Sequence, residues 1–537
     1  MDLLKPSPAN SSPLTPLGLL ERAATVYGDC TSIIYNKTTY TWSQTNRRCL
    51  QLASSLKSMG IQRGDVVSVL SPNLPAMYEL HFAVPMSGAI LNAINTRLDA
   101  RTFSVILHHS ESKLIFCFWW KKINPKRGFC RSLVLEAISL FPSEVKPPVL
   151  ILIMDDDVHP IATVGDFNLD LTYERLVSIG DPDFKWVRPN SEWDPMVLNC
   201  TSGTTSAPKG AVNLCPVYLW TLSMFHSNGW SFPWGMAAVG GINICLRKFD
   251  AASVHSLIHQ HNVTHMCGAP IVLIMLANNP SKEPLPNPVK ILTSGASPPS
   301  PVLFQIESLG FMVSHGYGLT ETNGCVLSCA WKHEWNKFPA TERAKLKARQ
   351  GTRTIGTTKV DVLDPESGAS VECDGSSVGE IVLRGASIFL GYFKDPVSTA
   401  RSLKEDGWFY TGDLGVMHPD GYIEIKDRSK DVIISGGENI SSVEVETVLY
   451  SHQAINEAAV VARPDEFWGE TPCAFVSLKL GIVRPSENDI IEFCRSRLPH
   501  YMVPKTIVFQ ESLPKTSTGK IKKFELKNEA KKLGFRY

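Results

Sequence analysis

The sequence predicts an α/β protein with a large N-terminal domain of parallel-rich sheets flanked by helices, a β-rich subdomain, and a small, mobile α+β C-terminal domain. Three observations indicate this fold. Short apolar runs alternate with longer helical patterns through about the first three hundred residues. Beyond Val378 the pattern changes to alternating strands around tight turns. About the last hundred residues mix helical and strand patterns.

Four apolar runs predict strands of the parallel sheets: DVVSVL (65–70), PVLILIM (148–154), PMVLNC (195–200) and VKILTSGA (289–296). Ligands of such sheets bind beyond the carboxyl ends of the strands. The segments TSGTTSAPKG (201–210) and SGAS (294–297) both come at such ends. These two segments can therefore face one crevice.

The β-rich subdomain is predicted to end in a hairpin. GEIVLRG (379–385) is typical of a strand, and residues 409–428 form two alternating runs. The residues between these runs are Pro-Asp-Gly at 419–421, which favour a turn. We therefore expect two antiparallel strands that meet at this turn.

A domain boundary is predicted just after the hairpin. DRSKDVIISGGEN (427–439) is polar at its start and contains glycines at its end, which is typical of a hinge. The predicted domains are residues 1–429 and 430–537. In the second domain the patterns predict a helix from Ser442 to Tyr450, strands at AAVVARP (458–464) and CAFVSLK (473–479), and a helix from Ser486 with a capping box to Asp489.

The composition is that of an ordinary globular protein and excludes several classes of partner. The 537 residues are 43% hydrophobic and 20% charged, with a net charge of +1, so bulk charge favours neither nucleic acid nor an anionic membrane. The 13 cysteines include no CxxC pair, and the N-terminus lacks a signal-peptide pattern. No apolar run reaches the ~18 residues of a membrane span. We expect a cytoplasmic protein, with the peroxisome as the alternative, although the C-terminus GFRY is not an SKL-type signal.

The segment TSGTTSAPKG (201–210) is crowded with hydroxyl groups and small residues. Hydroxyls and unhindered N–H groups can surround phosphate oxygens, Gly203 lets the backbone approach closely, and Lys209 supplies a positive charge. The spacing of a Walker P-loop is not met, because Gly210 follows Lys209. The segment predicts a phosphate-binding loop of another type, with an ordinary surface loop as the alternative.

Four further stretches follow this loop in order: HGYGLTET (315–322), YTGD (410–413), KDRSKD (426–431) and PKTSTGKIKK (514–523). Together with the loop they resemble the motifs of the adenylate-forming acyl-activating enzymes, the superfamily of acyl-CoA synthetases, peptide-synthetase adenylation domains and luciferases. The resemblance covers nearly the whole chain. Residues 218–230 and 434–446 are most similar to plant acyl-activating enzymes that act on short- to medium-chain or aromatic carboxylic acids.

This resemblance implies the adenylate-forming enzyme fold and a two-step ligase of fatty-acid and lipid metabolism. A small-molecule carboxylate would attack the α-phosphate of ATP, with Mg²⁺ bound, to give an acyl-adenylate, and coenzyme A would then displace AMP. Residues 1–429 would be the AMP-binding domain and residues 430–537 its C-terminal cap. Two alternatives stay open: acyl transfer to a carrier-protein thiol, and a non-catalytic nucleotide-binding paralogue.

The resemblance also assigns roles to individual residues. The loop around the β- and γ-phosphates would contain Thr201, Ser202, Gly203, Thr204, Thr205 and Lys209. Tyr317 would stack on adenine, Thr320 would bind a phosphate, and Glu321 would hold Mg²⁺, which prefers oxygen ligands. Asp413 would accept both ribose hydroxyls, and Arg428 would donate to the same sugar.

Further residues are assigned to the acyl pocket, the pivot and the second half-reaction. Lys520 would supply positive charge during adenylation, and Lys430 would be the pivot of the small domain. His226 would border the acyl pocket together with Trp230. The adenine and acyl pocket would also contain Ser294, Gly295 and Ala296, and the pantetheine tunnel would be lined by Gly436, Gly437 and Glu438.

Each assignment has a purely structural alternative. Tyr317 and His226 are also compatible with the core, and Glu321 with an acid that starts a helix. Asp413 is compatible with a turn and Arg428 with a solvated surface charge. The identity of the acid and the oligomeric state are not specified, because no motif sets the side-chain directions that shape the pocket.

Three segments outside the motifs need a separate interpretation. His255, His259, His261 and His265 fit a metal site less well than a surface helix that leads into a strand. Relatives continue through an extra helix after Val212, whereas only NLCPV (213–217) stands here, so we predict a deletion. CFWWKKINPKRGFC (117–130) is longer and more basic than expected, which fits a solvated insertion or a binding patch. The deletion favours the non-catalytic alternative.

Overall fold

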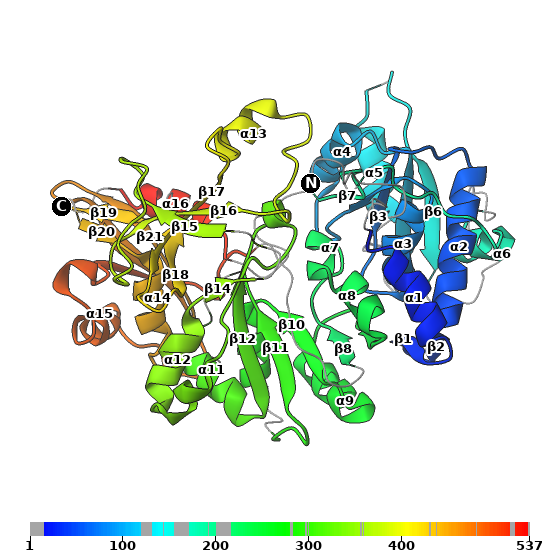
Figure 1. The fold of residues 1–537 in the computed structure, drawn as a ribbon. Helices are drawn as coiled ribbons and strands as arrows, with labels where there is room; N and C mark the ends of the chain where they lie inside the picture. The colour runs from blue at the N-terminus through cyan, green and yellow to red at the C-terminus, as the bar shows by residue number, and fades with distance from the viewer. Residues whose placement is uncertain are drawn as a thin grey trace, which may run out of the picture. The chain divides into compact units, whose positions relative to one another are not determined.

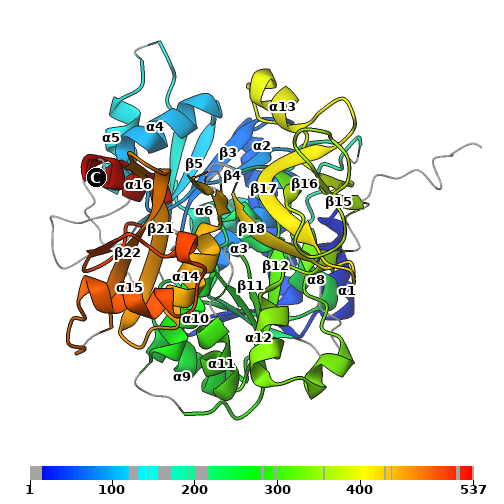
Figure 2. The same ribbon diagram turned by 90° about the vertical axis from the view of Figure 1, so that its left-hand side faces the viewer.

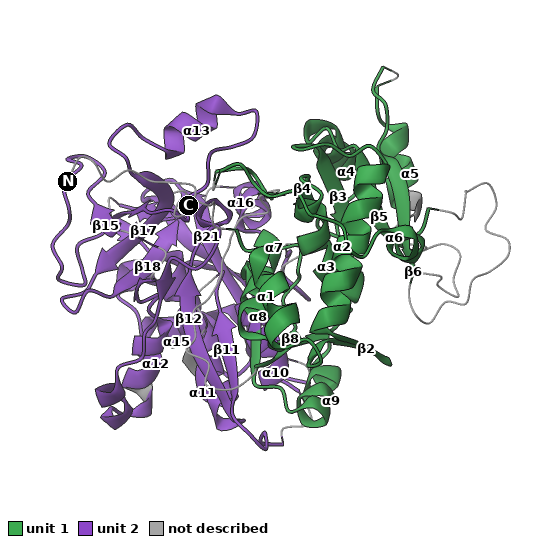
Figure 3. Ribbon diagram, turned by 45° about the vertical axis from the view of Figure 1, so that its right-hand side comes forward, with its two compact units in different colours: residues 1–201, 210–266 green, residues 202–209, 267–537 purple. Residues whose placement is uncertain are grey.

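The computed structural model describes most of the chain, which forms two compact units (Figure 3). Unit 1 is residues 1–201 and 210–266, and unit 2 is residues 202–209 and 267–537. The described residues are 15–119, 131–142, 144–154, 171–191, 193–199, 216–279, 283–295, 298, 300–354, 357, 359–428, 431–436, 438–479, 481–515 and 521–534.

Unit 1 contains the predicted parallel sheet. Its five strands run parallel in the order β6-β5-β3-β4-β7. They are β3 (Val66–Leu70), β4 (Ile90–Ala93), β5 (Leu114–Trp119), β6 (Val149–Met154) and β7 (Val197–Leu198). Three of the runs that predicted strands are therefore strands here, although the last one pairs over only two residues.

Helices cover both faces of this sheet (Figure 1). Phe103 in α4 packs with Ile115 in β5 and with Val134 in α5 on one face. Phe116, which points to the opposite face, contacts the ring of Tyr173 in α6 at 6.0 Å between centroids. The helices are α2 (Trp42–Ser58), α3 (Pro75–Met86), α4 (Ala100–His109), α5 (Arg131–Ser139) and α6 (Tyr173–Ile179).

A buried charge pair ties three of these helices together. The Arg48 Nε in α2 lies 2.7 Å from Oε1 of Glu79 in α3. The hydroxyl of Tyr173 in α6 donates to Oε2 of the same carboxylate at 2.5 Å. Glu79 is fully buried, so both partners are needed to offset the desolvation of its carboxylate.

A second sheet of unit 1 contains β8 (Val217–Trp220), β9 (Ile242–Cys245), β1 (Thr31–Tyr35) and β2 (Thr38–Thr41) in that order. The first three are parallel, and β2 forms an antiparallel hairpin with β1. Asn243 joins them, since it accepts from Trp220 Nε1 and donates to the carbonyl of Ser32, each at 3.0 Å. The helices of this part are α1 (Gly18–Val26), α7 (Ser227–Trp230), α8 (Phe232–Val239) and α9 (Ala251–His261).

Unit 2 begins with a mixed sheet. Strands β11 (Val289–Thr293) and β12 (Phe311–Tyr317) are parallel, and β13 (Leu327–Ser328) and β14 (Thr352–Arg353) continue antiparallel. The predicted hairpin is the last pair of a four-stranded antiparallel sheet: β15 (Lys359–Leu363), β16 (Gly379–Arg384), β17 (Phe409–Met417) and β18 (Ile423–Arg428). The helices of this part are α10 (Pro270–Ala277), α11 (Ser300–Ser308), α12 (Ala340–Ala348), α13 (Pro396–Ser402), and the short 3-10 turns η2 (Thr320–Thr322) and η3 (His333–Lys337).

The C-terminal part of unit 2 is a sheet with both faces covered (Figure 2). In β21, Ala458 and Val460 pack against α14 and α15, whereas Ala459 and Val461 pack against α16. The elements are β19 (Ile433–Ser435), β20 (Glu438–Ile440), α14 (Ser442–Tyr450), β21 (Ile455–Asp465), β22 (Gly469–Leu478), α15 (Glu487–Arg495), β23 (Thr506–Phe509) and α16 (Lys523–Lys532). The predicted helix 442–450 and the Ser486–Asp489 capping box are both present. The domain boundary at 429/430 stays a prediction.

Candidate functional site

Several predicted site residues lie outside the described part of the chain. They include the phosphate loop, the predicted pivot and the predicted catalytic lysine. The position of the predicted deletion after Val212 also lies outside the described residues. The residues are Thr201, Ser202, Gly203, Thr204, Thr205, Lys209, Ala296, Lys430, Gly437 and Lys520. Their roles stay predictions from the sequence.

Three residues of three separate motifs meet around one carboxylate in unit 2. The Tyr317 hydroxyl, at the end of β12, donates to Oδ2 of Asp413 at 2.6 Å. Arg428 Nε, at the end of β18, lies 3.2 Å from Oδ1 of the same carboxylate. Asp413 is only 4% exposed. The tyrosine of HGYGLTET, the aspartate of YTGD and the arginine of KDRSKD therefore form one cluster.

The hairpin and the turn before Asp413 account for this geometry. Asp413 and Arg428 are direct cross-strand partners in the β17–β18 pair, so their side chains share one face. Gly412 has a φ of +72°, a conformation that glycine adopts without strain, and its N–H donates to Oε1 of Glu380 at 2.9 Å. The hydroxyl of Thr411 donates to the Ile381 carbonyl at 2.7 Å. These contacts fix the backbone that presents the carboxylate.

The electrostatics of the cluster keep Tyr317 a neutral donor. Burial and the adjacent Asp413 charge raise the pKa of the Tyr317 hydroxyl well above its usual value of 10.0. A carboxylate offers about four lone-pair positions, and Tyr317 and Arg428 each use one on a different oxygen. Both oxygens of Asp413 therefore retain capacity for donors such as two sugar hydroxyls.

Glu321 lies in the short turn η2, which follows β12. Its Oε1 accepts from the Tyr392 hydroxyl at 2.9 Å, and its main-chain carbonyl accepts from Phe389 N–H at 2.7 Å. The Thr322 hydroxyl donates to the carbonyls of Leu319 and Gly324, which stabilises the turn. The sequence analysis missed Tyr392, because 71 residues separate it from Glu321 and no local pattern links them.

Ser294 and Gly295 lie directly after β11, as the strand pattern predicts. Ser294 is 1% exposed, and within the described part of the chain its Oγ has no hydrogen-bond partner. Gly295 has a φ of +93°. A buried, unpartnered hydroxyl at the end of a parallel strand is available to a ligand.

Gly436 and Glu438 lie in the β19–β20 hairpin. Gly436 has a φ of +59°, and its N–H donates to the Trp468 carbonyl at 2.8 Å. A Cβ on Gly436 would lie only 2.6 Å from Cε3 of Trp468, so the glycine permits a close approach. Trp468 was missed by the sequence analysis, because the contact joins two hairpins that are distant in the sequence.

His226 and Trp230 belong to unit 1. Both are buried, at 9% and 2% exposed, which fits the core alternative for His226 as well as a pocket wall. His226 precedes, and Trp230 belongs to, an unusual turn in which every residue from 227 to 231 has a positive φ. Left-handed backbone costs about 1–2 kcal/mol per non-glycine residue, and such strain is concentrated at functional sites.

The described residues contain no group of three metal-ligating side chains. His255 and His259 are neighbours on α9 with ring centroids 4.6 Å apart, and β10 (His265–Gly268) follows this helix, as the helix-and-strand interpretation predicts. In the same part of the chain no helix is long and apolar enough to cross a membrane.

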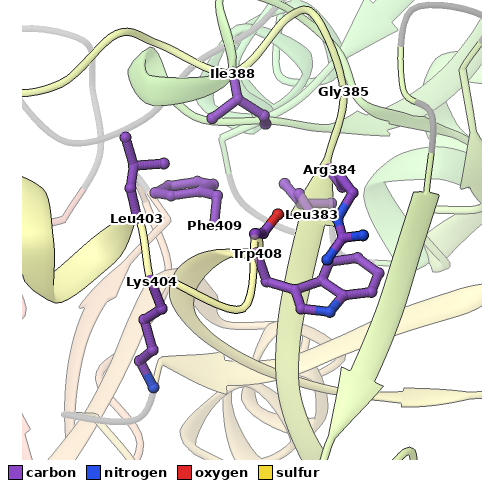
Figure 4. A pocket seen from close by; sticks show the side chains of 9 residues that line it. Leu383, Arg384, Gly385, Ile388, Leu403, Lys404, Trp408 and Phe409 are labelled. Atoms are coloured by element: carbon purple, nitrogen blue, oxygen red, sulfur yellow. Dashed lines mark hydrogen bonds between the residues drawn. The ribbon is translucent and has the colours of Figure 1, made fainter.

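A pocket of about 180 Å³ lies beside β16 and β17 (Figure 4). Ile388, Leu403 and Phe409 supply apolar surface to it, and the Arg384 guanidinium lies over the Trp408 ring. Arg384 also donates to the carbonyls of Asp406 and Gly407, which engage two of the five N–H groups of its guanidinium. None of the residues that line this pocket was predicted to bind ATP, coenzyme A or the acid.

Comparison with known families decides what this combination of motifs and cluster represents. A family model described as AMP-binding enzyme matches residues 20–393, and one described as AMP-binding enzyme C-terminal domain matches residues 444–520. The chain belongs to the AMP-binding enzyme family. The resemblance inferred from the five motifs is thereby confirmed.

Relatives of this AMP-binding enzyme match it along its whole length. A 2-methylpropanoate–CoA ligase of Humulus lupulus is 64% identical, over 99% of this chain and 98% of the relative. A probable peroxisomal acyl-activating enzyme 5 of Arabidopsis thaliana is 62% identical, over 99% of each. The first match extends over 554 positions, more than the 537 residues of this chain, so this chain lacks residues that the relative has.

Solved structures confirm the fold class. An anthranilate CoA ligase in complex with anthranoyl-AMP superposes with a TM-score of 0.80 at 22% identity, covering 96% of this chain and 97% of that one. An o-succinylbenzoate CoA synthetase from Bacillus subtilis, in complex with its acyl-adenylate, gives 0.75 at 23% identity over 95% and 97%. This AMP-binding enzyme therefore has the adenylate-forming enzyme fold.

Proposed function

We propose that this protein is an ATP-dependent carboxylate–CoA ligase that activates a short- or medium-chain or aromatic acid. The observation that carries the proposal is the buried Asp413 carboxylate, held by Tyr317 and Arg428, in a chain whose full-length relatives are named CoA ligases or acyl-activating enzymes. A buried anion with free lone pairs is suited to the two hydroxyls of a ribose.

The residues divide the work between the two half-reactions. Asp413 and Arg428 bind the ribose, Tyr317 packs against adenine, and Thr320 and the 201–209 loop bind the phosphates. Lys520 and the N–H groups of the loop stabilise the charge that accumulates when the carboxylate attacks the α-phosphate. Gly436, Gly437 and Glu438 then line the path of the coenzyme A thiol, and Lys430 is the pivot between the two steps.

The residues around Glu321 fit a magnesium ion. Magnesium is usually held by one or two carboxylates together with phosphate oxygens and waters, and Glu321 offers a half-exposed carboxylate with one oxygen engaged by Tyr392. The ion would neutralise charge on the phosphates of ATP. Glu321 is the described residue that would hold it.

We propose that the acid binds near His226 and Trp230 of unit 1. Because the Humulus relative is named for 2-methylpropanoate, a short branched acid is the first compound to test. The test is ATP–pyrophosphate exchange by folded full-length protein with 2-methylpropanoate, acetate, a medium-chain acid and benzoate. Exchange with any of them supports adenylation, and AMP release that requires free coenzyme A separates this ligase from transfer to a carrier-protein thiol.

One observation favours a second function. The chain lacks residues that its relative has, which favours a non-catalytic nucleotide-binding paralogue if the loss removes part of the phosphate site. ATP binding by a folded sample without exchange on any acid would establish this second function and overturn the first.

The proposed compartment is the cytoplasm, with the peroxisome as the alternative because one Arabidopsis relative is named peroxisomal. Microscopy of the chain with a fluorescent tag at its N-terminus distinguishes the two. A diffuse signal supports the cytoplasm, whereas coincidence with a peroxisomal marker overturns it.

A further inference from the structure

The carboxylate predicted to hold magnesium is itself held by another segment of unit 2, residues 389–392. Phe389 N–H donates to the main-chain carbonyl of Glu321 at 2.7 Å, and the Tyr392 hydroxyl donates to its Oε1 at 2.9 Å. The first contact fixes the backbone of Glu321 and the second fixes its side chain. Among the described residues the Glu321 carboxylate accepts no other hydrogen bond.

Further hydrogen bonds and ring contacts hold residues 389–392 in place. The N–H of Tyr392 donates to Oγ1 of Thr399 at 2.9 Å, and Thr399 in turn donates to the Asp395 carbonyl at 2.8 Å. The ring of Phe389 packs edge-on against Tyr392 at 4.9 Å and against Phe409 at 5.6 Å between centroids. Phe409 also lines the adjacent pocket, next to Leu403 (Figure 4). Tyr392 is therefore held by a hydrogen bond of its backbone N–H and by the contact of its ring with Phe389.

The glycine before Tyr392 permits a close approach to Thr399. Gly391 has a φ of +142°, and a Cβ there would lie 2.8 Å from Cγ2 of Thr399. The Tyr392 hydroxyl is the donor in its contact with Oε1 of Glu321, because a carboxylate offers only acceptor positions.

We propose that Tyr392 is a positioning residue for the metal-binding step: its hydroxyl holds Oε1 of Glu321 and thereby leaves Oε2 available for magnesium. The inference rests on the proposed function, since it needs Glu321 to hold the ion that accompanies ATP. Partners that orient a metal ligand typically contribute about 10–100-fold to metal affinity. Tyr392→Phe removes the hydroxyl, and with it the hydrogen bond to Glu321 and the interaction with Ser402, and keeps the ring.

The readout is ATP binding by calorimetry, without acid or coenzyme A, in magnesium and in EDTA. The ratio of the two dissociation constants measures how much the metal strengthens ATP binding. For Tyr392→Phe we expect this ratio to fall about 10-fold, with affinity in EDTA unchanged. Glu321→Gln should lose the metal-dependent gain, because the amide cannot replace the charged ligand.

The matched control is Tyr173→Phe in unit 1, because Tyr173 also donates to a glutamate, Glu79, at 2.5 Å. This variant should lose stability and keep the wild-type ratio. A Tyr392→Phe protein with the wild-type ratio, or with equal losses in magnesium and EDTA, overturns the inference. A wild-type protein that exchanges pyrophosphate but gains no ATP affinity from magnesium also overturns it. Failure of the wild type to bind ATP at all would instead remove the proposed function, and the inference with it.

Discussion

Asp413 is the central residue of the proposed nucleotide site, because its buried carboxylate in β17 contacts side chains from the ends of β12 and β18. Tyr317 and Arg428 each contact a different oxygen. Removal of the carboxylate charge would leave the partly exposed Arg428 guanidinium without this counter-ion and the proposed ribose without its acceptor.

For Asp413→Asn we predict a loss of ATP affinity of about 10–100-fold, the range expected for hydrogen bonds to a charged group. Isothermal calorimetry with ATP measures it. Asp406→Asn is the control, because Asp406 also accepts from a tyrosine hydroxyl, that of Tyr410 at 2.9 Å, but on the surface. Equal affinities for Asp413→Asn and wild type would mean that Asp413 is only a structural residue of the hairpin.

Lys520 provides a second prediction at the residue scale. Lys520→Ala should lower acyl-adenylate formation by about 10²–10³-fold, the scale for loss of one charge-stabilising donor, while coenzyme A transfer from supplied acyl-adenylate largely survives. Pyrophosphate exchange and thioester formation are measured separately. Lys522→Ala, which breaks only a half-exposed pair with Glu525, should change neither. A parallel loss of both half-reactions in Lys520→Ala would assign Lys520 a structural role.

At the scale of elements, α14 shows how a helix start joins the two predicted domains. Ser441 caps the helix and also donates to the Lys426 carbonyl at 2.7 Å. The Asp427 carboxylate in β18 accepts from both the N–H and the hydroxyl of Ser442. Lys523, the first residue of α16, donates to the same hydroxyl at 2.5 Å. The start of α14 therefore binds a strand and a second helix.

We predict that Ser442→Ala lowers the free energy of unfolding by about 1–3 kcal/mol, because it leaves Asp427 and Lys523 with fewer partners in a buried place. A shift of the urea midpoint of unit 2 measures this. Ser451→Ala at the other end of the helix is the control, because its exposed hydroxyl donates only to the Val448 carbonyl and should cost little. Similar shifts for both variants would exclude a special role of the Ser442 cluster.

The elements also show what could be predicted from the sequence. The helix 442–450 and the Ser486–Asp489 capping box were predictable because their signals lie within a few residues of each other. The PMVLNC run was predicted as a full strand, yet β7 pairs over two residues, because an apolar run does not reveal how far a neighbour extends. The Tyr392–Glu321 and Gly436–Trp468 contacts were missed because pairing between distant segments leaves no local pattern.

At the scale of the whole molecule, the order of the motifs was enough to predict the family. Packing, by contrast, determines how the stability of unit 1 depends on pH. His81 is a fully buried residue of unit 1, whose Nδ1 lies 2.7 Å from the Met77 carbonyl. Burial disfavours the imidazolium and lowers the pKa of His81 from 6.5 to about 4. The unfolded chain therefore binds a proton at pH 5 that the folded protein does not bind.

Stability should consequently fall as the pH drops from about 6.5 towards 4, and be fully present above that window. Between pH 7 and pH 5 this residue should cost about 2 kcal/mol of unfolding free energy. The free energy of unfolding of His81→Gln should change less with pH over the same interval, since the glutamine amide does not titrate. Urea unfolding of both proteins at the two pH values measures the difference, and parallel pH profiles would contradict the assignment.

The contacts at the start of α14 affect how the protein would be distributed between two arrangements of its predicted domains. Ser441 and Ser442 lie on one side of the predicted pivot at Lys430, and Lys426 and Asp427 lie on the other. These contacts can exist in only one of the two arrangements that a rotation there would interconvert. A contribution of about 1–3 kcal/mol biases the ratio of the two arrangements about 5–150-fold. If Lys430 is the pivot, as the sequence predicts, turnover needs contacts of similar free energy in the other arrangement, or a bound ligand that supplies the difference.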